Sequence, residues 1–87
     1  MERDELIVVC AVRYALGRMT YIVAEVCDYV ASKKDSLSQQ CINSIISDVE
    51  ENLEMCRKMG RTLGMECDEQ RWVRLLDDLK QYKEQQT

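Results

Sequence analysis

Apolar residues recur at helical spacing through the middle of the chain and define its clearest element. An apolar side chain at every third or fourth position lines one face of an α-helix. This spacing holds from position 41 to position 56 and predicts a helix with one buried face. The residues of that face are Cys41, Ile42, Ile45, Ile46, Val49, Leu53 and Cys56.

The ends of this helix are predicted from capping signals. Ser36 is followed three residues later by Gln39, which fits the capping-box pattern at the start of a helix. Gly60 or Gly64 is expected to end the helix, because glycine adopts the left-handed conformation that closes a helical turn.

A second clear stripe predicts the last helix, with Asp68 as its cap. Its inner face is expected to contain Trp72, Leu75, Leu76 and Leu79, with Tyr82 at its edge. The charged residues between them, such as Arg71, Arg74, Asp77, Asp78 and Lys80, are expected to face water. The tail from residue 85 to residue 87 is expected to fray.

The first segment is ambiguous, because residues 6 to 16 are apolar almost all the way round, apart from Arg13. Such a run is a buried helix or a buried strand. We favour a helix, since no partner strands are evident elsewhere, and Asp4 is placed to cap it. Gly17 either ends this helix or lies inside one longer helix, and if it ends the helix, Thr20 caps the next one.

The second helix is predicted to end near Ser32, and its apolar face contains Ile22, Val23, Val26, Cys27 and Val30. The 87 residues contain no proline and three glycines, so they offer few breaks to long helices. We therefore expect an all-α fold, a bundle of three or four helices in one domain spanning residues 1–84.

Composition excludes several chemistries. The chain has no histidine and no glycine-rich phosphate loop, so we expect no histidine-dependent nucleophile, no bound metal and no cofactor. The five cysteines lack the paired spacing of a zinc site and are expected to be mostly core residues, with Cys67 the most exposed thiol. The protein is predicted not to be an enzyme. The longest apolar run is too short for a membrane span, and no secretory signal is present, so a cytoplasmic location is expected.

A candidate anion site lies where the first helix would end. If the chain bends at Gly17, the free N–H groups of the next helix face a loop that carries Arg18. Arg13 and Thr20 could add polar contacts, and the two tyrosines could stack on a planar ligand. The candidate ligand-binding residues are Arg13, Tyr14, Arg18, Thr20 and Tyr21. The alternative is structural, in which Thr20 only caps, the tyrosines are half-buried and Arg18 pairs with an acid.

Charge provides a second candidate surface. Residues 35 to 56 contain acidic residues and no lysine or arginine, and the whole chain has a net charge of −4. This balance argues against direct nucleic-acid binding. Asp48, Glu51 and Glu54 could instead bind a basic surface of a partner protein, with charge guiding the encounter. An ordinary solvated helix face is the alternative.

Two stretches resemble a small family of phage and prophage proteins. Residues 12–18, "VRYALGR", followed by "TYIV" at 20–23, are similar to the early helix of that family. The later "DEQRWVRLLDDL" is similar to its tryptophan-containing final helix. The resemblance spans about residues 11 to 80 and implies a viral origin.

Small acidic phage proteins of this kind often inhibit bacterial immunity, and the resemblance therefore implies a similar role for this protein. We expect a non-enzymatic protein that binds a bacterial defence effector, as anti-CRISPR proteins do. One alternative is a sponge that sequesters an anionic nucleotide signal; another is a phage regulatory or assembly module. Apolar surplus around the first helix also suggests a homo-oligomer.

Overall fold

The computed structural model describes residues 1–16, 22–58 and 66–86 of the chain. Within these ranges lie four α-helices: α1 (Arg3–Leu16), α2 (Ile22–Lys33), α3 (Gln39–Lys58) and α4 (Glu66–Gln86). A short 3-10 turn, η1 (Lys34–Ser36), follows α2. The described ranges contain no strand, which confirms the predicted all-α fold and its helical bundle.

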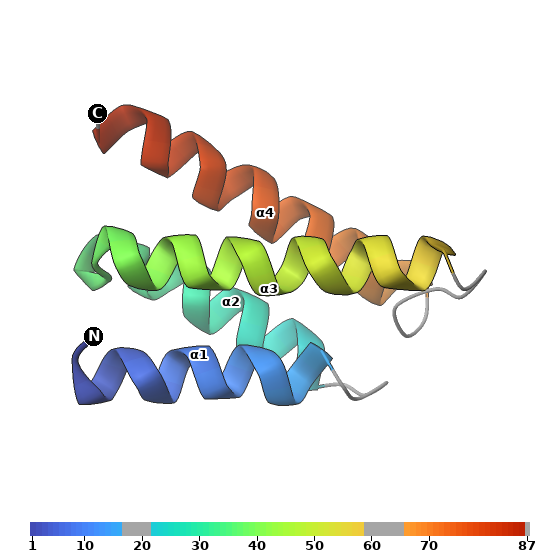
Figure 1. The fold of residues 1–87 in the computed structure, drawn as a ribbon, viewed down its shortest axis with the longest axis horizontal. Coiled ribbons are helices and arrows are strands. Elements are labelled where there is room, and N and C mark those ends of the chain that lie inside the picture. Colours follow the sequence, from blue (N-terminus) through green and yellow to red (C-terminus); the bar gives the residue numbers. More distant parts are fainter. Residues whose placement is uncertain (17–21, 59–65, 87) are drawn as a thin grey trace.

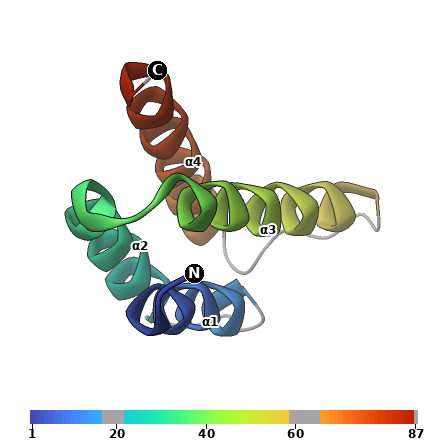
Figure 2. The same cartoon turned by 60° about the vertical axis from the view of Figure 1, so that its left-hand side comes forward.

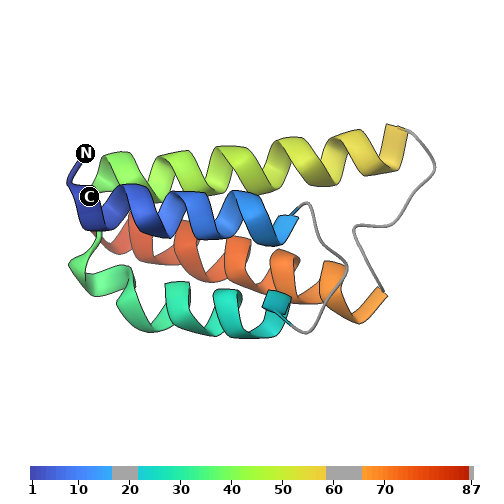
Figure 3. The ribbon, with the colours of Figure 1, turned by 90° about the horizontal axis from the view of Figure 1, so that it is seen from below.

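Successive helices run in alternating directions, and α1 and α4 lie on opposite sides of the bundle. α1 packs against α2 and α3, and α4 packs against the same two helices. The views in Figures 1 and 2 show α2 and α3 between the two outer helices. The start of α1, the start of α3 and the end of α4 all lie at one end of the bundle (Figure 3).

One hydrophobic core fills the space between the helices. Val12 of α1, Val30 of α2, Ile45 of α3 and Leu79 of α4 are completely buried in it. Burying a side chain of this size contributes about 1.5–3 kcal/mol. The α3 stripe is confirmed, because its members from Cys41 to Leu53 are buried and Cys56 packs partly buried against them.

The N-terminal ends of two helices differ from the prediction. α1 begins at Arg3, because the carbonyl of Glu2 already accepts the N–H of Leu6 at 3.0 Å. Asp4 therefore lies in the first turn, where an acidic side chain suits the helix dipole without capping. Likewise α4 begins at Glu66 and contains Asp68. α4 extends to Gln86, into the segment predicted to fray.

The start of α3 also differs, because Ser38 caps it and Ser36 does not. The Oγ of Ser38 accepts the N–H of Cys41 at 3.2 Å. Ser36 belongs to η1, and its Oγ donates to the carbonyl of Lys33 at 2.9 Å. Leu37 separates the two elements with an extended backbone, so the predicted capping box does not form.

α1 is not buried all round, contrary to its prediction. Leu6, Ile7 and Tyr14 are each at least half exposed, and the thiol of Cys10 is exposed too. The reason is geometric, because α1 packs against two helices and these cover one side of it.

Three further predictions concern positions outside the described residues: the bend at Gly17, the cap at Thr20 and the stop at Gly60 or Gly64. The side chain of Cys67 is also outside them. No described helix has both the length and the apolar character needed to cross a membrane.

Candidate functional site

The predicted anion site is only partly within the described residues. Arg13 and Tyr14 belong to α1, whereas Arg18, Thr20 and Tyr21 lie outside the described ranges. The anion site as a whole therefore stays a prediction.

Arg13 faces α3 and is paired with a carboxylate there. Its Nε donates to Oδ2 of Asp48 at 2.7 Å. The side chain of Arg13 is 59% exposed and that of Asp48 only 18%. The hydrogen bond to Asp48 and the charges of Asp48 and Glu51 raise the pKa of Arg13 above its ordinary value. One predicted anion ligand and one predicted partner contact thus form a single ion pair.

Tyr14 follows Arg13 but points in another direction. Successive residues of an α-helix are rotated by about 100° around its axis. Arg13 contacts Asp48 of α3, whereas Tyr14 is 54% exposed on the outer side of α1. The structure therefore does not bring these two candidate ligand residues together.

Acidic side chains of α3 occupy the exposed surface between α1 and α4. Glu50, Glu51 and Glu54 are all exposed. Oε2 of Glu50 accepts Nζ of Lys80 from α4 at 3.0 Å. Glu54 lies 3.4 Å from Nζ of Lys58, one helical turn further on. We call Glu50, Glu51 and Glu54 the acidic face.

The acidic face borders a shallow hollow of about 390 Å³ beside the end of α4. All three glutamates line it, and Lys83 of α4 is the cation among its lining residues. Carboxylates therefore outnumber ammonium groups around a depression that could receive a basic side chain. Of the predicted partner-binding residues, Glu51 and Glu54 belong here, whereas Asp48 turns toward α1.

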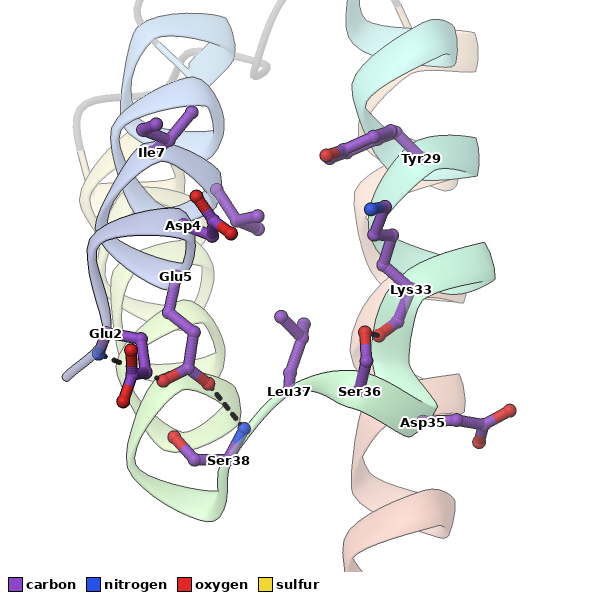
Figure 4. Close-up of a pocket in the computed structure, with 11 residues that line it drawn as sticks. Glu2, Asp4, Glu5, Ile7, Tyr29, Lys33, Asp35, Ser36, Leu37 and Ser38 are labelled. Carbon is purple, nitrogen blue, oxygen red and sulfur yellow. Dashed lines mark hydrogen bonds between the residues drawn. The ribbon is translucent and has the colours of Figure 1, made fainter.

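A larger hollow of about 720 Å³ lies at the end of the bundle where α1 begins. Figure 4 shows Asp4 and Ile7 of α1 facing Tyr29 and Lys33 of α2 across it, with Leu37 at one end. Nζ of Lys33 lies 5.4 Å from the centre of the Tyr29 ring. This hollow was not predicted from the sequence, because its lining comes from three separate segments.

Glu5 is the buried acid at the edge of this hollow, and its carboxylate is fully engaged. One oxygen accepts the N–H of Ser38 at 2.5 Å, and the other accepts the N–H of Glu2 at 3.3 Å (Figure 4). These hydrogen bonds stabilise the charged carboxylate and so lower the pKa of Glu5. The bond from Ser38 has the largest effect. Glu5 therefore joins α1 to the start of α3 and is not free to hold a ligand.

Cys41 completes the junction between α1 and α3. Its Sγ donates to the carbonyl of Glu5 at 3.8 Å, and its side chain is completely buried. Burial raises the pKa of the Cys41 thiol, and the nearby charge of Glu5 raises it further. Cys41 therefore stays a neutral thiol and acts as a packing residue.

Neither metal-binding clusters among the described residues nor comparisons with known proteins indicate a function. The part of the chain that the structure describes holds no cluster of three cysteine, aspartate or glutamate side chains suited to a metal ion. Comparison with protein-family models, curated proteins and solved structures gives no match. A function must therefore be inferred from the surfaces described above.

Proposed function

We propose that this protein is a non-enzymatic phage protein that antagonises a bacterial immune system by binding an effector protein inside the infected cell. The type of target follows from the resemblance of residues 12–23 and of the tryptophan-containing helix to small phage proteins. The binding surface follows from one observation, the exposed acidic face of α3.

The chemistry of the acidic face suits a basic protein surface. Effectors that handle nucleic acids carry lysine and arginine along the grooves that contact phosphates. Exposed carboxylates attract such a groove over a distance and compete for its cations. An anti-CRISPR-like inhibitor of this kind would occupy the groove that its target uses for nucleic acid.

The ion pairs on the acidic face do not prevent this role. Both side chains of the Glu54–Lys58 pair are more than two-thirds exposed, and those of Glu50 and Lys80 are about half exposed. Exposed pairs of this kind contribute little to stability. Their carboxylates can therefore exchange an internal lysine for a cation of the partner at small cost.

Asp48 and Arg13 lie next to the acidic face, and the carboxylates near Arg13 make this region unfavourable for a phosphate. A nucleotide phosphate placed beside Arg13 would also approach the carboxylates of Asp48 and Glu51, which repel it. This arrangement favours a protein partner over the nucleotide sponge at this part of the surface.

Phage infection provides the test. The protein is expressed in bacteria that each carry one defence system, and plaque formation by a sensitive phage is counted. We expect the unaltered protein to restore plaques against one system and to co-purify with the effector of that system. The double variant Glu51→Lys with Glu54→Lys should abolish both effects, since it replaces two carboxylates with ammonium groups.

A matched control separates the acidic face from net charge. Glu25→Lys with Asp28→Lys changes the total charge by the same amount on the exposed side of α2. This control should keep full activity. Failure to restore plaques against any system tested, or equal activity of the two double variants, would overturn the proposal. A thermal shift with a nucleotide and no bound effector would instead favour the sponge.

A further inference from the structure

We draw no further inference here: the strongest candidate, the exposed apolar face on the outer side of α1 that includes Leu6, Ile7 and Cys10, carries nothing because no feature of the described residues shows what covers it.

Discussion

Ser38 begins α3 with two hydrogen bonds of different origin. Its Oγ accepts the N–H of Cys41, and its own N–H donates to the carboxylate of Glu5. In an ordinary capping box the second acceptor comes from a glutamate or glutamine at the third helical position. That position here is Cys41, and a glutamate 33 residues earlier in the chain takes over its role.

Removing the cap hydroxyl should destabilise the protein measurably. We expect Ser38→Ala to lower the free energy of unfolding by about 1 kcal/mol, because the N–H of Cys41 loses its acceptor. Urea unfolding followed by circular dichroism measures the change. Ser36→Ala is the control and should have a much smaller effect, since Ser36 is not a cap. Equal losses in the two variants would contradict the assignment of Ser38 as the cap.

Predictions from the sequence failed most often for the contacts of individual residues. Ser36 and Gln39 have the spacing of a capping box, but the extended backbone at Leu37 moves the start of the helix to Gln39. The Arg13–Asp48 pair joins residues 35 positions apart. Local patterns contain no information on such contacts, because they depend on how whole helices pack.

At the scale of elements, two charged side chains of α1 link it to α3. Glu5 bonds to the start of α3, and Arg13 bonds to Asp48 at its middle. α1 and α3 run in the same direction, so the two links hold them in register along their length (Figure 1). The apolar surfaces between them provide the attraction, and the polar links fix the alignment.

The link through Glu5 should make stability depend on pH. The folded protein lowers the pKa of Glu5 below its ordinary value of 4.5, so the unfolded chain binds the proton more readily. Its contribution is therefore complete above about pH 5 and is lost as the pH falls toward the lowered pKa. Glu5→Gln should be less stable than the unaltered protein at neutral pH.

The two proteins should become more alike in acid. Because protonated glutamate and glutamine are both neutral, the difference in unfolding free energy should shrink as the pH falls below about 5 toward the lowered pKa of Glu5. Urea unfolding at a series of pH values measures this difference. A difference that stays constant over the whole range would contradict the role of the ionised Glu5.

The periodic apolar stripes predicted the helices well. On α1, however, they did not indicate which face is buried. Val23, Val26 and Val30 marked the inner face of α2, and all three are buried. On α1 the apolar residues cover both faces, so periodicity could not show which face meets the core. The answer depends on how many neighbours α1 has, which is a property of the whole bundle.

At the scale of the whole molecule, the core depends heavily on α4. Trp72 is 1% exposed and is the single tryptophan of the chain. Lys34 of η1 bonds to Asp78 of α4 at 2.7 Å, so α4 is also tied to the turn that follows α2. Helical stripes alone could not predict that α4 packs on α2 and α3 opposite α1.

Truncating Trp72 should destabilise the whole bundle. We expect Trp72→Ala to lower the free energy of unfolding by about 3–5 kcal/mol, because it leaves a large cavity among the helices. Trp72→Phe should lose less, and Val73→Ala, at a partly exposed neighbouring position, should lose least. Urea unfolding followed by circular dichroism reports the order of these losses, and a different order would contradict this packing.

The bond between Glu5 and Ser38 gives the first few residues an influence beyond their own helix. Deleting residues 1–5 would disturb a helix that starts more than thirty positions later, because it removes the acceptor of the Ser38 N–H. During synthesis the carboxylate leaves the ribosome well before the amide that it will meet. The beginning of α3 can therefore reach its final form only after α1 has folded back to receive it.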